Sequence, residues 1–245
     1  SNSGNITTSG TGVLNVVMWS DFDNDNNDGG VSLGGTVSTN GGHVWLGGSN
    51  SNGGSYIWNG LTVGDGPSIG SLNYNFNGLD FYGDISTNGG DILAWAGNGV
   101  SGDGQGVTTD TNGMSLNLGS GNATFISDGI FSAGGGNITL TSTGKLTLAP
   151  NDGAYPGTLV WSHNNVPSVL NLGGYLDYLL INNSTSLGGL TIGEYNGTGL
   201  VGDSNFNISN TSDITISNTI NSAGGVRLSG RTINTNANIT ATALN

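Results

Sequence analysis

Residues 35–46 read Gly-Thr-Val-Ser-Thr-Asn-Gly-Gly-His-Val-Trp-Leu, and the same pattern returns several times along the chain. Residues 83–94 read Gly-Asp-Ile-Ser-Thr-Asn-Gly-Gly-Asp-Ile-Leu-Ala and are identical at six of the twelve positions. Weaker copies occupy residues 129–140 and 218–228, and residues 187–192 keep the glycine pair with the apolar strand after it. Each copy predicts two short strands, because apolar and small polar residues alternate on both sides of a glycine turn.

The spacing of these copies predicts a repeat architecture. The glycine pairs that begin at residues 41, 89 and 135 lie 48 and 46 residues apart. Repeats of this size are typical of solenoids, propellers and arrays, in which one unit cannot bury its apolar face without its neighbours. We interpret the period as two coils of about 22 residues, which gives about eleven coils and a rod roughly 50 Å long.

The repeat also predicts which side chains stack. We expect two inward columns, one of Val44, Ile92, Ile138 and Val226 and one of Leu46, Ala94, Leu140 and Leu228, with Trp45, Leu93, Thr139 and Arg227 pointing outward. Asparagines at equivalent corners are expected to form ladders along the stack.

Composition agrees with many short strands. The chain has 245 residues, of which 47 are glycine, and only 34% are hydrophobic. The apolar residues nevertheless alternate too regularly for a disordered linker, and no segment sustains the i, i+3, i+4 pattern of a helix. We therefore expect an all-β chain with one continuous domain over residues 1–245 and a less regular insertion at residues 159–181.

The charge balance limits the partners. Sixteen acidic residues stand against three basic ones, Lys145, Arg227 and Arg231, for a formal net charge of −13. Without a basic surface, binding to nucleic acids or to anionic membranes is not expected. No apolar run is long enough for a transmembrane helix, so membrane insertion is not expected either. The chain has no cysteine, which favours a bacterial exported protein, and the lack of an initiator Met suggests a piece of a longer one.

Two phrases of the chain resemble a known family. Residues 83–93 (Gly-Asp-Ile-Ser-Thr-Asn-Gly-Gly-Asp-Ile-Leu) and 136–148 (Gly-Asn-Ile-Thr-Leu-Thr-Ser-Thr-Gly-Lys-Leu-Thr-Leu) are similar to the repeats of filamentous-haemagglutinin-like exoproteins and autotransporter adhesins of Gram-negative bacteria. The resemblance implies a right-handed parallel β-helix (a β-solenoid) that is secreted or displayed on the bacterial outer surface. Tandem β-sandwich domains are the alternative fold.

From this resemblance we expect a structural and adhesive segment, not an enzyme. It would serve as a rigid stalk in attachment or biofilm formation, with glycans or cell-surface and matrix components as partners. Flanking repeats of the parent protein, or further copies of the chain, are also expected to contact it. One alternative is a carbohydrate-binding or polysaccharide-degrading β-helix protein, and another is a filament or sheath subunit.

An acidic loop is the first candidate site. Asp21, Asp23 and Asp25 lie two residues apart, and Asp28 follows in the same loop. Carboxylates at this spacing can converge on Ca²⁺, which takes six to eight oxygen ligands. The loop departs from an EF-hand, which requires glycine where Asn26 stands and glutamate where Ser32 stands. Calcium is therefore the one cofactor that we consider, and a solvated acidic turn is the alternative.

Three aromatic residues form the second candidate site. Trp45 is expected to face outward, and Tyr56 and Trp58 share a strand face. Aromatic rings of this kind can stack on sugars, because each has an apolar face and a polar group. The alternative is that Tyr56 and Trp58 are core residues and Ile57 lies outside.

Overall fold

The computed structural model describes residues 4–20, 28–48, 55–66, 68, 70–71, 78–96, 107–109, 113–126, 130–132, 138–149, 159–162, 169–172, 179–181, 188–197, 200–201, 208–209, 214–216, 220–236 and 238–244. This part of the chain forms strands, turns and bends only. It contains no helix long and apolar enough to cross a membrane.

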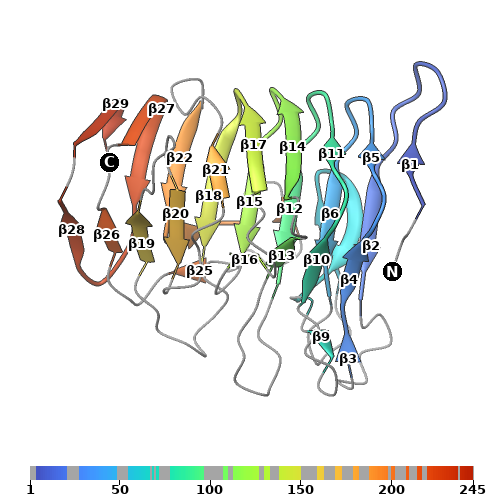
Figure 1. Ribbon diagram of the computed structural model, residues 1–245, viewed down its shortest axis with the longest axis horizontal. Helices are drawn as coiled ribbons and strands as arrows, with labels where there is room; N and C mark the ends of the chain where they lie inside the picture. Colours follow the sequence, from blue (N-terminus) through green and yellow to red (C-terminus); the bar gives the residue numbers. More distant parts are fainter. Residues whose placement is uncertain are drawn as a thin grey trace.

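Three sheets account for most of the strands (Figure 1). A ten-stranded sheet contains, in spatial order, β1 (Ile6–Thr7), β5 (Val37–Ser38), β11 (Ile85–Ser86), β14 (Met114–Gly119), β17 (Ile138–Ser142), β21 (Leu179–Ile181), β20 (Val169–Leu172), β19 (Leu159–Ser162), β26 (Ile214–Ile216) and β28 (Ile233–Thr235). An eight-stranded sheet contains β2 (Val16–Trp19), β6 (Val44–Gly47), β12 (Ile92–Trp95), β15 (Ala123–Ile126), β18 (Lys145–Ala149), β22 (Gly189–Ile192), β27 (Ile220–Leu228) and β29 (Ile239–Leu244). A four-stranded sheet contains β16 (Ile130–Ser132), β13 (Val107–Thr109), β10 (Leu79–Phe81) and β4 (Val31–Leu33).

Smaller sheets lie beside these three. β7 (Ser55–Trp58) and β8 (Leu61–Gly64) form an antiparallel hairpin that also pairs with β24 (Leu200–Val201). β3 (Asp28–Gly29) pairs with β9 (Gly70–Ser71), and β23 (Glu194–Tyr195) pairs with β25 (Ile208–Ser209).

The chain visits the three large sheets in a fixed order. The successions β4–β5–β6, β10–β11–β12, β13–β14–β15 and β16–β17–β18 each run from the four-stranded sheet through the ten-stranded sheet to the eight-stranded one. Equivalent strands pair in parallel. The structure is thus all-β with mostly parallel sheets, which is consistent with a β-helix or solenoid and unlike antiparallel sandwiches.

The step between neighbouring strands is uneven, which corrects the expected coil size. Along the start of the eight-stranded sheet, the hydrogen bonds join residues 28, 48, 31 and then 23 positions apart. The 48-residue spacing is therefore one step and not two coils of about 22 residues, because the β7–β8 hairpin lies within it. The sheet accordingly has eight strands where eleven coils were expected.

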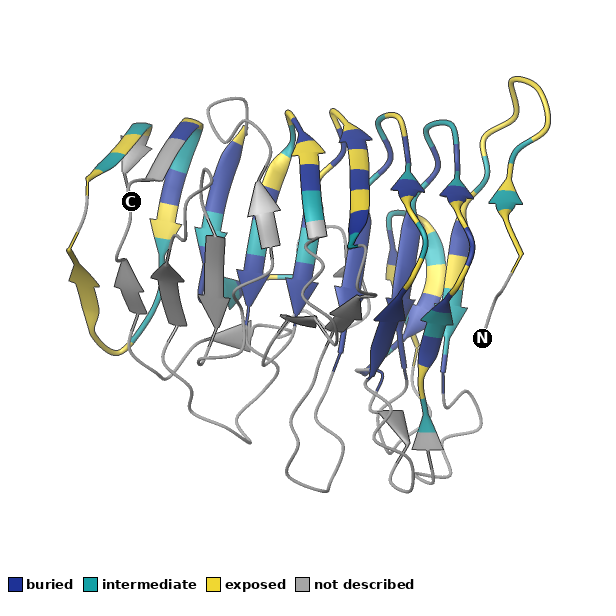
Figure 2. Ribbon diagram, viewed as in Figure 1, coloured by how far each residue is buried: buried dark blue, intermediate teal, exposed yellow. Residues whose placement is uncertain are grey.

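Two inward columns of apolar side chains lie on the eight-stranded sheet and belong to the inner core. Figure 2 shows the burial of the strands of this sheet as dark blue and teal. In register, the two columns are Val16, Val44, Ile92, Ala123, Leu146, Leu190 and Val226, and Met18, Leu46, Ala94, Phe125, Leu148, Ile192 and Leu228. The expected columns are confirmed except at their third member. Ile138 and Leu140 belong to β17 in the ten-stranded sheet, so Ala123 and Phe125 take those places.

The insertion expected at residues 159–181 supplies strands to the ten-stranded sheet. β21 pairs in parallel with β17, β20 pairs antiparallel with both β21 and β19, and β19 pairs in parallel with β26. An antiparallel meander is therefore placed within the otherwise parallel sheet.

Glycines stack at the corner between the ten-stranded and eight-stranded sheets, along the upper edge in Figure 1. The glycine column consists of Gly42, Gly90, Gly121, Gly144, Gly188 and Gly224. A Cβ atom on Gly90 would lie 1.9 Å from the carbonyl oxygen of Gly42, and one on Gly121 would lie 2.0 Å from that of Gly90. Neighbouring coils therefore approach more closely here than any side chain permits.

We predict that Gly121→Ala lowers the free energy of unfolding by about 2 kcal/mol, because the backbone of two coils must separate to admit the methyl group. Gly12→Ala is the matched control, since the nearest atom to its Cβ is the Ser9 carbonyl oxygen at 3.7 Å. Chemical denaturation of both variants measures the difference. Equal stability of the two variants would show that the close approach does not constrain the fold.

Candidate functional site

The β7–β8 hairpin covers part of the outer face of the eight-stranded sheet. Asn59 and Gly60 form its two-residue turn with φ angles of 47° and 81°, as the left-handed Asn-Gly turn requires. The hairpin packs on the sheet through an aromatic cluster of Trp45, Trp58, Val63, Leu93, Trp95, Ile126, Ala149 and Tyr195, with Trp19, Tyr56 and Leu61 at its margin. This second core contains four of the five tryptophans of the chain.

The cluster corrects the predicted aromatic site. Trp45 does point away from the inner core, but it is fully buried, because the hairpin lies over it. Its ring also covers Gly47, where a Cβ would lie 2.6 Å from the indole. Trp58 is 3% exposed, Tyr56 is half-buried and Ile57 is 40% exposed, so the alternative with Ile57 outside fits the hairpin. Stacking of a sugar on Trp45 is excluded by this burial.

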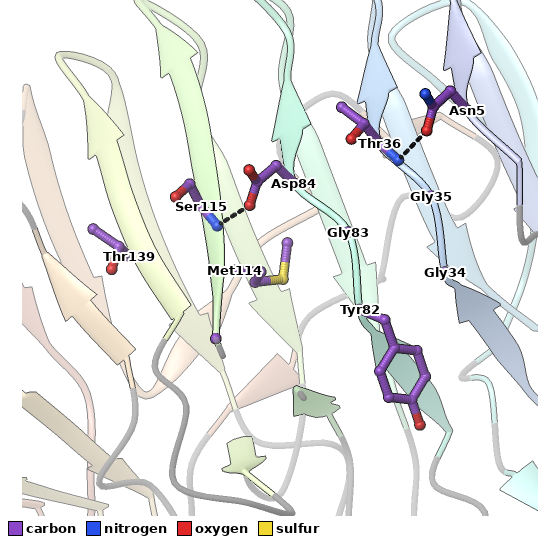
Figure 3. A pocket seen from close by; sticks show the side chains of 11 residues that line it. Asn5, Gly34, Gly35, Thr36, Tyr82, Gly83, Asp84, Met114, Ser115 and Thr139 are labelled. Atoms are coloured by element: carbon purple, nitrogen blue, oxygen red, sulfur yellow. Dashed lines mark hydrogen bonds between the residues drawn. The ribbon is translucent and has the colours of Figure 1, made fainter. Parts of the chain in front are cut away.

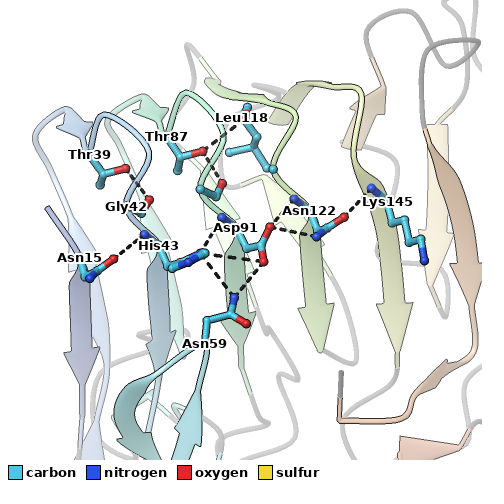
Figure 4. A network of polar contacts seen from close by, with 12 residues as sticks. Asn15, Thr39, Gly42, His43, Asn59, Thr87, Asp91, Leu118, Asn122 and Lys145 are labelled. Atoms are coloured by element: carbon cyan, nitrogen blue, oxygen red, sulfur yellow. Dashed lines mark hydrogen bonds and ion pairs between the residues drawn. The ribbon is translucent and has the colours of Figure 1, made fainter. Parts of the chain in front are cut away.

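A polar ladder runs beside the first part of the glycine column, through the residues that follow Gly42, Gly90, Gly121 and Gly144 (Figure 4). The members of the ladder are Asn15, His43, Asp91, Asn122 and Lys145, and a side-chain atom of each of the first four accepts the backbone N–H of the next. The four donor–acceptor distances run from 2.7 to 3.0 Å. The expected ladder is therefore present, but it contains histidine and aspartate as well as asparagine. Each of these side chains can accept the backbone N–H of the next member.

Two residues of the hairpin, Trp58 and Asn59, contact this ladder. The Asn59 amide donates to Asp91 Oδ2 at 2.8 Å and lies 3.4 Å from His43 Nδ1. The His43 ring meets Trp58 edge to face, with ring centres 5.7 Å apart. Because the Asp91 N–H donates to His43 Nδ1, that nitrogen acts as an acceptor. Through its contacts with Asn59 and Trp58, the His43 ring holds the tip of the hairpin in place.

A groove of about 460 Å³ lies beside this contact on the outer face of the eight-stranded sheet. We call it the threonine groove. It is lined by Trp58 and Asn59 of the hairpin, by Asp91, Asn122 and Lys145 of the ladder, by Thr124, Thr147, Thr191 and Arg227, and by Glu194, Tyr195 and Asn196.

The floor of the groove continues the column that begins under the hairpin. Trp45, Leu93, Thr124, Thr147, Thr191 and Arg227 occupy one register line across successive strands. The three threonines are half-buried, and their hydroxyls form no hydrogen bond that the described residues record. The outer face is therefore apolar where the hairpin covers it and rich in hydroxyl groups where the groove is open.

Charged groups stand at both ends of the groove. The guanidinium of Arg227 forms a two-point ion pair with Glu194, in which Nε donates to Oε1 and Nη2 donates to Oε2. At the other end, Asp91 accepts both N–H groups of Asn122 at Oδ1 and the amide of Asn59 at Oδ2. Both carboxylates of the groove are therefore occupied by donors of this chain.

Tyr195 lies between the aromatic cluster and the groove. It is 3% exposed, and burial, with a smaller contribution from the Asp91 carboxylate, raises the pKa of its hydroxyl above the usual value. The phenol stays protonated in the folded protein and is held as a neutral hydroxyl at the groove wall.

A second cavity of about 590 Å³ opens at the junction of the four-stranded and ten-stranded sheets (Figure 3). Tyr82, 47% exposed, stands beside it, and its rim consists mainly of glycines and short side chains. Its polar groups are committed to a second ladder, in which Asn5 accepts the N–H of Thr36 at 3.0 Å and Asp84 accepts that of Ser115 at 2.7 Å. These groups stabilise the corner, so we take the threonine groove as the candidate site.

The predicted calcium site stays a prediction. Asp21, Asp23 and Asp25 lie outside the described residues, and only the backbone of Asp28 is described, paired with Ser71 in the β3–β9 sheet. In the described part of the chain, no three His, Cys, Asp or Glu residues gather in a way that could hold a metal ion.

Sequence reasoning missed the threonine groove, because its residues come from five separate strands and from the hairpin. The available signal was the phrase glycine, polar residue, apolar residue, threonine, apolar residue, at residues 121–125 and 144–148.

Comparison of the chain with protein-family models, with curated proteins and with solved structures found no match.

We predict that His43→Asn is tolerated and His43→Leu is not. The asparagine oxygen can accept the Asp91 N–H, as Asn15 accepts that of His43, whereas leucine leaves the N–H without an acceptor, a loss of about 2 kcal/mol. Denaturation of both variants tests this, since both lose the contact with Trp58. A leucine variant as stable as the asparagine variant would contradict the ladder.

We predict that Tyr195 destabilises the protein in alkali. Its folded pKa lies above the unfolded one, so the protein loses stability as the pH rises above about 10, where the unfolded phenol ionises. The melting temperature of Tyr195→Phe should therefore fall less between pH 9 and pH 11 than that of the unchanged protein. Tyr82→Phe, at an exposed position, should keep the original slope.

Proposed function

We propose that this chain is a segment of a right-handed parallel β-helix from a secreted or surface-displayed bacterial adhesin, and that the threonine groove binds carbohydrate. The observation that carries the proposal is the row of Thr124, Thr147 and Thr191, which presents three open hydroxyls on neighbouring strands. Adjacent strands are about 4.8 Å apart, so these groups form a regular line on a rigid surface.

The groups that line the groove suit a sugar. Each sugar hydroxyl both donates and accepts hydrogen bonds, and threonine hydroxyls and asparagine amides do the same. Asn122 and Asn196 also line the groove. Trp58 and Tyr195 form part of the groove wall but are each only 3% exposed, so the sugar contacts that we propose are hydrogen bonds and not ring stacking.

The fold supports a mechanical role alongside binding. Successive strands pair along the whole stack, and the corner is fixed by both the glycine column and the polar ladder. A site built on such strands keeps its geometry when the protein is pulled or crowded at a cell surface. We therefore propose a stalk that carries its own binding face.

We propose binding without cleavage. Hydrolysis of a glycosidic bond uses two carboxyl groups, one of which gives a proton to the leaving oxygen. The two carboxylates at the groove, Asp91 and Glu194, are occupied by Asn59, Asn122 and Arg227. An oligosaccharide incubated with the protein should be recovered intact, and the appearance of shorter products would contradict this part of the proposal.

We predict that the double substitution Thr147→Val and Thr191→Val abolishes carbohydrate binding on a glycan array. Valine keeps the branched shape that strands favour and removes only the hydroxyl groups, so the fold should persist. Thr141→Val, at an exposed position of β17 in the ten-stranded sheet, is the matched control and should bind normally. An array on which the unchanged protein binds no glycan would overturn the proposal, as would unaltered binding by the double variant.

A further inference from the structure

The few positive charges of this chain gather at the threonine groove. Of its three basic residues, Lys145 and Arg227 both line the groove, while the chain as a whole carries a formal net charge of −13. Together with Asp91 and Glu194 they make the groove formally neutral. The groove therefore repels an anion less than the net charge of the protein alone would suggest.

Lys145 stands on the groove floor, at the start of β18. Its backbone N–H is held by Asn122 Oδ1 at 2.9 Å, which fixes the position of the residue. On the neighbouring strand it pairs with Gly189, where a Cβ would lie 3.4 Å from Lys145 Cγ. The stem of the lysine thus lies beside Gly189 on the neighbouring strand.

The two cations differ in what they contact. Arg227 is engaged with Glu194 at two points, so its charge is compensated. The ammonium group of Lys145 has no ion pair with any described residue, and its side chain is exposed. Thr147 lies two residues further on the same face of β18, so hydroxyl groups lie next to the uncompensated charge.

We propose that the groove recognises an anionic saccharide, one with a carboxylate or sulfate substituent, and that Lys145 pairs with this substituent. The inference rests on the proposed function, because the threonine hydroxyls would hold the rest of the sugar. Lysine is a compact point charge without a fixed fork geometry, so it accepts either anion. Arg227 stays with Glu194 and closes the far end of the groove.

The test compares three oligosaccharides of the same linkage and length by titration calorimetry. The first is β-1,4-linked glucose, the second is the same chain with its C6 groups oxidised to carboxylates, and the third carries sulfate at C6. Lys145→Gln removes the charge, and Lys145→Arg keeps it. Arg231→Gln changes the net charge of the protein by the same amount at a position that does not line the groove.

We expect at least one anionic chain to bind about tenfold more tightly than the neutral chain. Lys145→Gln should remove this preference, so that the variant binds the neutral and anionic chains equally, and Lys145→Arg should largely restore it. The preference should also weaken as salt is added. Comparing the carboxylate and sulfate arms then identifies the substituent.

Three results would overturn the inference in distinguishable ways. Equal binding of neutral and anionic chains would refute the role of Lys145 while the proposed carbohydrate binding stands. The same loss in Arg231→Gln as in Lys145→Gln would show that overall charge, and not the groove, sets the preference. If none of the three chains binds and the protein also binds no glycan on the array, both the proposed carbohydrate binding and the role of Lys145 are refuted.

Discussion

The close approach of successive coils at one corner is the constraint on which the rest of the structure depends. Each glycine of the column lies against the backbone of the coil before it, at a distance that leaves no room for a Cβ atom. After Gly42, Gly90, Gly121 and Gly144, the next residue also donates its N–H to a side chain of the coil before it. Because these contacts recur at the same corner, they set the register of the inward columns that follow.

This register also creates the outer surface. A strand that places Val44 and Leu46 inward must place Trp45 outward, and the same rule puts Thr147 outward in β18. The position of the hairpin then determines which outward residues are buried. The hairpin buries Trp45 and Leu93 in the aromatic cluster, and beyond its tip the threonines stay open. The groove is the open part of this sheet face beside the tip of the hairpin.

The sequence predicted the parallel stacking units and most members of the inward columns, because alternation and the glycine pairs are local signals. It misplaced Ile138 because the column position was assigned from glycine pairs, whereas single glycines at 121 and 144 serve equally well. Trp45 was expected to be exposed because alternation gives the direction of a side chain but not what covers it. The groove combines residues from distant strands, and no local pattern records that assembly.

The uneven steps between paired strands have an evolutionary consequence. Steps of 23 and 48 residues are accommodated in one stack, because only the strands and the glycine corner must match between coils. The remainder of a turn is free to lengthen without disturbing its neighbours. Such a scaffold can acquire or lose whole hairpins beside an unchanged sheet, so that its outer surface diversifies through insertions while the stacked frame is inherited intact.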